Sequence, residues 1–223
     1  MATSAINPTT GILETAYRFV AHGLKQGLCS VCGEMMDVVA EHAPGTSEHF
    51  RHERHSLCPT VTKNRIRYES LGSSEYDDEQ AINLRNSVSE HMYEVCLTFQ
   101  ALAEGGRISE FRDALKKADE INIWRYRGMT INFVPYILLT FVDMFESKQS
   151  VFRDTDFFFV LPPGIRTIDR LWNQTAGVKD VVIKISKNFD VLAEHSIRPS
   201  LFPVIHPAWF ERSLSSLSQR IEK

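Results

Sequence analysis

Three of the four cysteines and four of the eight histidines in this chain fall between Cys29 and Pro59. Thiolates and imidazoles are the ligands that zinc most often has in proteins, and a Cys-x-x-Cys turn lets two thiolates reach one ion. Cys29 and Cys32 form such a turn, and Cys58 follows on the far side of a loop. The spacing therefore predicts one structural zinc ion per chain, with a histidine as its fourth ligand.

The fourth ligand is either His52 or His55, because both lie close enough before Cys58 to share one ion with it. A redox dithiol is an alternative for Cys29 and Cys32, but such a motif belongs at the end of a strand that leads into a long helix. An HNH-like nuclease site within EHFRHERH is a second alternative. Those domains usually carry two Cys-x-x-Cys knuckles, whereas here Cys58 stands alone.

The order CSVCGEMM, HFRH and LCP resembles the N-terminal zinc-binding region of CoiA-type competence proteins, over about residues 15–60. The resemblance implies that Phe50 packs behind the metal site and that His52, not His55, is a ligand. The implied ligand set is Cys29, Cys32, His52 and Cys58. It also implies a nuclease domain after the zinc region, so a metal-dependent nuclease is the alternative function.

A nuclease core of that kind needs an acid on one strand and an acid-x-Lys element on the next, so that two carboxylates hold Mg²⁺. The chain has one acid-x-Lys, Glu146-Ser147-Lys148, at the polar end of an apolar segment, where a solvated helix end explains it better. Other acids flank apolar strands near Lys184 and could hold a metal, although acids are common at such boundaries: Asp154, Asp156, Asp169 and Asp180. We therefore expect a protein that is not an enzyme.

Positive charge is concentrated between Arg51 and Arg67, where five basic residues face one acid, Glu53, for a local excess of +4. In an extended segment, alternation would place Lys63, Arg65 and Arg67 on one face, where they could follow a nucleic-acid backbone. The alternative is a solvated edge strand whose charges discourage pairing with another strand.

The elements that must position these residues indicate an α+β fold in two parts. Short strands around the cysteine turn, including TAYRFVAHGL, predict a small β-rich zinc-binding module over residues 1–68. A polar, turn-rich stretch, residues 69–80, reads as a linker. Residues 81–223 then form a mixed α/β domain that begins with a long amphipathic helix.

Within that larger domain, apolar residues every three or four positions predict one helix from Ala81 to Leu102. A second helix follows with Ser109 as its N-cap, and residues 121–145 read as a strand leading into a buried helix. Buried strands are expected at Thr155–Pro162 and Asp180–Ser186, and a last helix through residues 209–223.

Composition limits the remaining function classes. The chain of 223 residues is 43% hydrophobic with a net charge of −3, so a nucleic-acid contact must rest on a local patch. No signal peptide or membrane span is predicted, which favours a cytoplasmic protein. We expect a non-enzymatic bacterial or phage zinc-binding protein that contacts nucleic acid, a protein partner or its own copy, in DNA uptake, mobile-element or phage-conflict biology.

Overall fold

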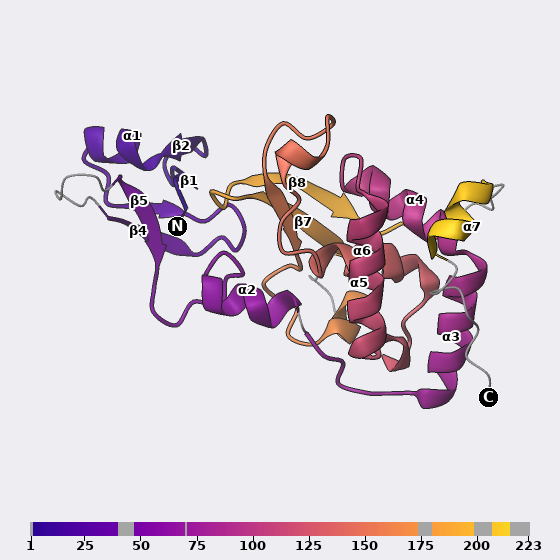
Figure 1. Cartoon of the computed structure of the whole chain (residues 1–223). Coiled ribbons are helices and arrows are strands. Elements are labelled where there is room, and N and C mark those ends of the chain that lie inside the picture. The colour runs from indigo at the N-terminus through magenta and orange to yellow at the C-terminus, as the bar shows by residue number, and fades with distance from the viewer. Residues whose placement is uncertain (1, 40–46, 70, 174–179, 199–206, 215–223) are drawn as a thin grey trace.

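The computed structural model describes residues 2–39, 47–69, 71–173, 180–198 and 207–214 of the chain, except for the side chains of residues 66–69 and 211. The α+β class is confirmed: an antiparallel five-stranded sheet with the cysteine and histidine cluster comes first, followed by helices and a three-stranded sheet. Figure 1 shows the first sheet at one end of the molecule and most of the helices at the other.

The first sheet has the strand order β2-β1-β3-β4-β5, with every neighbouring pair antiparallel. Its strands are β1 (Ser4–Ile6), β2 (Leu13–Thr15), β3 (Gln26–Leu28), β4 (Met35–Val39) and β5 (His49–His52). Phe19 and Phe50 are buried between the sheet and the segment after β2, with their rings edge to face and centroids 4.9 Å apart. This small core is what positions the ends of β3 and β5.

The expectation of a strand in TAYRFVAHGL is wrong, because this segment contains the helix α1 (Ala16–Ala21). A helix places Ala16 and Phe19, three residues apart, on the same buried face. The sheet is shaped to receive that face at Gly27, where a Cβ would lie 2.7 Å from the Cβ of Ala5 and 2.9 Å from the ring of Phe19. Packing of Phe19 into this space overrides the strand propensity of the segment.

The helical part contains α2 (Thr62–Glu69), α3 (Asp78–Glu90), α4 (Met92–Leu102), α5 (Ile108–Glu120), α6 (Val134–Thr140) and α7 (Ala208–Leu214). The single long helix expected from Ala81 to Leu102 is two helices, α3 and α4, separated at His91. Buried residues recur with the same period on both sides of the break, so periodicity could not reveal it. α7 confirms the described part of the last helix; the rest of that prediction lies outside the described residues.

Two further helix predictions need correction. The N-cap of α5 is Arg107, not Ser109, and the Glu110 carboxylate accepts a hydrogen bond from the Arg107 N–H at 2.7 Å. The strand expected before the buried helix α6 is replaced by short 3₁₀ turns, η1 (Ile123–Arg125) and η2 (Ile131–Phe133). Pro135 fits the first turn of α6, where its missing N–H has no helical partner.

The second sheet consists of β6 (Phe157–Val160), β7 (Val181–Ser186) and β8 (Val191–Ser196), with β7 in the middle. β6 and β7 confirm the two strands expected from apolar runs, and β8 was not expected. Phe157 and Phe159 join the large core beneath the helices, whereas Phe158 and Ile183 belong to a separate cluster on the opposite face. Because both faces are covered, β6 and β7 are buried throughout.

Residues close to the first sheet cover the opposite face of the second sheet, on which Phe158 lies. Val31, from the turn between Cys29 and Cys32, packs against the cluster of Phe158, and so does Phe189, which also contacts the core of the first sheet. The guanidinium of Arg65 on α2 lies 3.9 Å from the centroid of the Phe158 ring. Figure 1 accordingly shows β7 and β8 between the first sheet and the helices α5 and α6.

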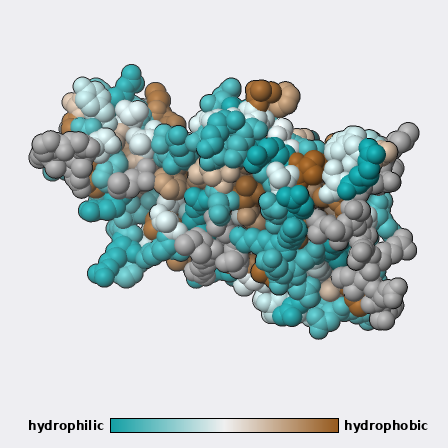
Figure 2. All heavy atoms as spheres, viewed as in Figure 1, coloured by the Kyte–Doolittle hydropathy of each residue, from teal (hydrophilic) through white to brown (hydrophobic). Residues whose placement is uncertain are grey.

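The face of the molecule seen in Figure 2 has no large hydrophobic patch: most of its residues are hydrophilic, and apolar residues are scattered in small groups. Across the described ranges, none of the helices has both the length and the apolar content that a membrane crossing requires.

Candidate metal centre

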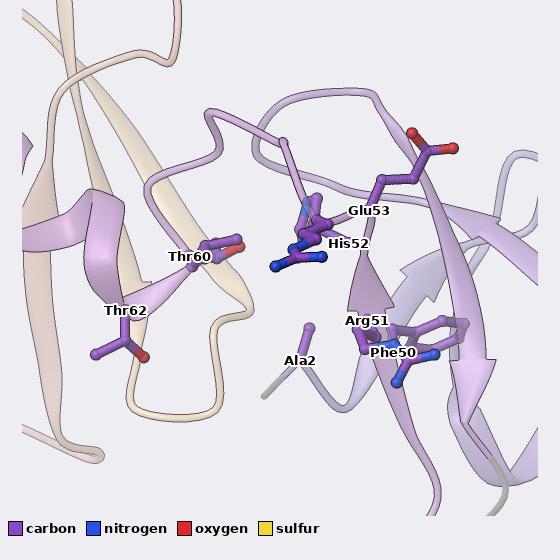
Figure 3. Close-up of a pocket in the computed structure, with 9 residues that line it drawn as sticks. Ala2, Phe50, Arg51, His52, Glu53, Thr60 and Thr62 are labelled. Atoms are coloured by element: carbon purple, nitrogen blue, oxygen red, sulfur yellow. The ribbon is translucent and has the colours of Figure 1, made fainter.

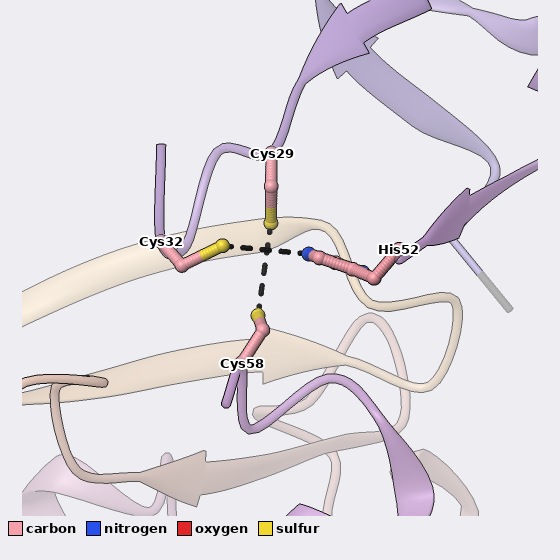
Figure 4. A group of neighbouring side chains, drawn as sticks. All are labelled: Cys29, Cys32, His52 and Cys58. Carbon is pink, nitrogen blue, oxygen red and sulfur yellow. Dashed lines mark hydrogen bonds between the residues drawn. The ribbon is translucent and has the colours of Figure 1, made fainter. Parts of the chain in front are cut away.

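Four side chains from three separate segments converge at one point (Figure 4). The Cys29 and Cys58 sulfurs are 3.8 Å apart, and the Cys32 sulfur lies 3.4 Å from Nε2 of His52. All four ligand atoms lie within 4.8 Å of one another. Among the residues that the structure describes, no other group of three or more Cys, His, Asp or Glu side chains is arranged to hold a metal ion.

These separations fit a tetrahedral ion. Zn–S bonds of about 2.3 Å place two sulfurs about 3.8 Å apart, and a Zn–N bond of about 2.0–2.1 Å places sulfur and nitrogen about 3.5 Å apart. Cys29 and Cys58 match the first value, and Cys32 and His52 match the second within about 0.1 Å. The Cys₃His group can therefore hold a metal ion with no coordination position left open.

The turn that carries Cys29 and Cys32 is closed by its own backbone. The Cys29 N–H donates to the Glu34 carbonyl at 2.8 Å, and the Gly33 N–H donates to the Cys29 carbonyl at 2.9 Å. Gly33 has a φ of +74°, which glycine adopts at little cost. The Val31 N–H points at the Cys29 sulfur at 3.4 Å, which favours a thiolate there.

His52 enters the site from the end of β5, whose pairing with β4 places it opposite Met36. Alternation along the strand puts Phe50 and His52 on the same face, and Phe50 is buried next to the site, as expected. His55, the competing ligand candidate, is exposed and is not part of the group. The structure therefore brings together Cys29, Cys32, His52 and Cys58.

Cys58 lies in a loop whose position depends on two residues that the sequence did not single out. The buried amide of Asn64, on α2, donates to the Ser56 and Cys58 carbonyls at 2.7 and 3.0 Å. The Thr60 hydroxyl lies 3.1 Å from the Cys58 sulfur. Neither residue type is a metal ligand of zinc sites, so only their closeness to Cys58 in the sequence could have suggested these roles.

The protonation states of the group depend on its own contacts. Hydrogen bonds with Cys32 and Cys58 lower the pKa of the Cys29 thiol far below its usual range, while the hydrogen bond with Cys29 raises the pKa of the Cys32 thiol far above it. Burial disfavours the charged His52 imidazolium, but hydrogen bonds with Cys29 and Cys58 outweigh it and raise the pKa of His52 to about 10. The metal-free group therefore holds protons that a metal ion must displace.

The extended segment expected to carry Lys63, Arg65 and Arg67 is instead the helix α2, so the alternation that would place all three on one face is wrong. Residues two apart on a helix point in different directions, so Arg65 faces away from Lys63. Arg65 stacks on Phe158 and donates to the Asp143 carbonyl, whereas Lys63 is exposed and donates to the Arg54 carbonyl at 3.3 Å. The Arg67 side chain lies outside what the structure describes.

Asp156 lies beside the acid-x-Lys segment, but among the described residues none of the acids considered for a nuclease site belongs to a group of three or more that could hold a metal ion. Asp156 accepts hydrogen bonds from Ser147 and Lys187, and the Ser147 bonds lower its pKa to about 2. Asp169 accepts hydrogen bonds from Ser73 and Ser74. Glu146 pairs with Lys148 at 3.2 Å, whereas Lys184 donates at 2.5 Å to Glu104, which lies 80 residues earlier in the chain.

Comparisons of the chain with protein-family models, with curated proteins and with solved structures found no match.

Proposed function

We propose that this chain is a non-enzymatic zinc-binding protein in which one structural zinc ion is held by Cys29, Cys32, His52 and Cys58. The observation that carries the proposal is the convergence of three thiols and one imidazole at separations typical of a tetrahedral zinc site. Thiolate-rich, four-coordinate groups of this kind are typical of structural zinc, because no position remains for water or substrate.

The place of the group in the fold supports a structural role. Its ligands come from the turn after β3, from the end of β5 and from the loop before α2, so one ion would fasten three segments. Cys29 and Cys58 are buried, and the small core between α1 and the sheet is a limited source of stability. Zinc binding would add folding free energy to this part directly.

The zinc-bearing part is also where we propose a contact with nucleic acid. Arg51, Arg54 and Lys63 are exposed around the ligand segment, and the resemblance to CoiA-type proteins favours a partner of that class. Arg65 does not belong to this surface, because its guanidinium packs on Phe158. The acidic balance of the whole chain makes a weak, salt-dependent contact the expected kind.

Elemental analysis of protein purified without chelators tests the zinc proposal. We expect about one equivalent of zinc per chain, and a Cys29→Ser, Cys32→Ser double variant should lose it. Retention of full zinc by that variant, or a consistent absence of zinc from the unaltered protein, would refute the assignment. The buried Cys96, which lies in the helical core, supplies the control: Cys96→Ser should keep its zinc.

A further inference from the structure

The three cysteines of the metal centre differ in how far solvent reaches them. Cys29 and Cys58 are 3% and 0% exposed, whereas Cys32 is only half-buried. Two hollows also border the centre, one of about 250 Å³ beside β5 (Figure 3) and one of about 530 Å³. Both hollows are bounded by His52 and by none of the three cysteines. A small molecule that approaches a sulfur of the centre therefore meets Cys32 first.

Cys32 has a second sulfur within reach in the same turn. The ligand atoms of the group all lie within 4.8 Å of one another, so the Cys29 sulfur is close to the Cys32 sulfur. The Gly33 N–H, which donates to the Cys29 carbonyl at 2.9 Å, holds both cysteines in one short stretch of backbone. Cys58 belongs to a different segment, where its sulfur lies 3.1 Å from the Thr60 hydroxyl. Cys29 is therefore the partner that can bond to Cys32 with the least movement of the chain.

We propose that Cys32 is an oxidation site for peroxide, and that a disulfide between Cys32 and Cys29 then dismantles the metal centre. The proposal rests on the zinc function proposed above, because coordination keeps both sulfurs as thiolates, the form that reacts. The Cys32 thiolate attacks one oxygen of hydrogen peroxide: an S–O bond forms, the O–O bond breaks and hydroxide leaves.

The second step closes the disulfide. The Cys29 thiolate attacks the sulfenic sulfur of Cys32, an S–S bond forms, the S–O bond breaks and a second hydroxide leaves. The two sulfurs have then given two electrons to the peroxide. His52 and Cys58 are the only ligands of the group that remain, so the centre can no longer hold its ion tightly.

The turn that carries this oxidation site also covers the second sheet. Val31, between the two cysteines, and Phe189 both pack against the cluster of Phe158. Phe189 has a φ of +68°, a left-handed conformation that is costly for a bulky residue and persists only where its surroundings enforce it. When the turn loses its metal and Val31 moves, Phe189 can relax and Phe158 loses part of its cover. Oxidation at Cys32 is thereby transmitted to the second sheet.

Titration of the zinc-loaded full chain with hydrogen peroxide tests the proposal. A colorimetric indicator measures released zinc, and mass spectrometry of the alkylated, trypsin-digested protein locates the disulfide. We expect about one zinc ion released for each disulfide formed, and renewed zinc binding after a phosphine reductant and fresh zinc are added. Oxidation should also increase binding of a hydrophobic dye.

The trypsin sites identify which cysteines have reacted. Residues 26–51 form one peptide that contains Cys29 and Cys32, so a disulfide between them lowers the mass of that peptide by two hydrogen atoms. Cys58 lies in the separate peptide of residues 55–63, so a disulfide to Cys58 would instead join two peptides.

A variant separates oxidation from coordination. Cys32→His keeps a zinc ligand but has no sulfur, so it should hold zinc and release it at least about tenfold more slowly under peroxide. The matched control is Cys96→Ser, which removes a buried thiol outside the centre. This control should hold zinc and release it as the unaltered chain does.

Four results would each overturn the proposal: zinc retained under peroxide, a disulfide to Cys58, equal rates of release in Cys32→His and the unaltered chain, or an oxidised chain that neither binds dye nor recovers zinc after reduction. If Cys32→His does not hold zinc, the position of the disulfide in the unaltered chain decides. Zinc near one equivalent that peroxide does not release would leave the zinc function standing. A chain purified without zinc would refute that function itself.

Discussion

Two ligands of the Cys₃His group, Cys29 and Cys58, each have a hydrogen-bonding neighbour that can fix the direction of the sulfur. The Val31 N–H is directed at the Cys29 sulfur, and the Thr60 hydroxyl lies beside the Cys58 sulfur. Groups that hydrogen-bond to metal ligands orient them and tune their basicity. The geometry of the metal centre therefore depends on the surrounding loop and turn as well as on the four ligands.

Histidine substitutions should separate the ligand from its exposed neighbour. His52→Ala removes the imidazole that completes the group, so we expect loss of most bound zinc. His55→Ala is the matched control and should retain zinc, because His55 is exposed. Metal content of the two purified variants measures this, and the opposite pattern would transfer the ligand role to His55.

Acid should release the metal. The metal-free group carries protons on Cys32 and on His52, whose pKa is raised to about 10, and both must leave when the ion binds. Protons therefore compete with zinc, and the apparent zinc affinity should fall as pH is lowered. Titration against a colorimetric chelator over a range of pH values measures this. Affinity that does not change with pH would contradict the assigned protonation states.

At the scale of elements, the helix α2 connects the metal centre to the rest of the molecule. Asn64 on its inner side holds the loop of Cys58, and Arg65 reaches the second sheet. Phe158, beneath Arg65, is 1% exposed. The same short helix therefore positions a metal ligand and covers an apolar strand.

Removing the Asn64 amide should weaken the metal loop. Asn64→Ala leaves the buried Ser56 carbonyl without its partner, at a cost of about 1–3 kcal/mol. We expect a lower melting temperature and weaker zinc retention against chelator. The adjacent exposed residue supplies the control, since Lys63→Ala should change both by little. Equal stability of the two variants would show that the Asn64 bonds do not hold the loop.

The elements also show where sequence patterns suffice. Ligand spacing predicted the three cysteines and left His52 and His55 open, and the resemblance pointed to His52, which the structure places in the group. Apolar runs were enough for β6 and β7. The pattern failed for α2, where alternating charges in TKNRIRYE suggested a strand but Asn64 and Arg65 find their partners from a helix. It missed β8, whose alternating exposure is that of an edge strand and whose position depends on β7.

At the scale of the whole molecule, the second sheet is enclosed by two different kinds of cover. Helices bury Phe157 and Phe159, while the metal turn and α2 contribute Val31 and Arg65 to the other face. Leu71, two residues after α2 ends, is already buried in the helical core. The region expected as a linker, residues 69–80, therefore contains a residue of the helical core, and we propose that the two parts depend on each other for stability.

A fragment that begins at Leu71 tests this dependence. Without the metal-bearing part, the face of Phe158 and Ile183 loses its cover, and each buried side chain of this size contributes about 1.5–3 kcal/mol. We expect the fragment to bind a hydrophobic dye and to melt at a lower temperature than the full chain. Removal of zinc from the full chain with a chelator should likewise increase binding of the dye. A fragment as stable as the full chain, with no dye binding, would show two independent folding units.

The contact between Val31 and the second sheet also has a consequence for biosynthesis. The turn of Cys29 and Cys32 leaves the ribosome long before β6 and β7 do, so it can fold and acquire its metal first. When Phe158 emerges, the surface that will cover it is already in place. If zinc is limiting during translation, the apolar face of β6 and β7 should therefore stay exposed and the chain should aggregate. Adding zinc before synthesis should reduce the amount of inclusion bodies, whereas adding it after synthesis should not.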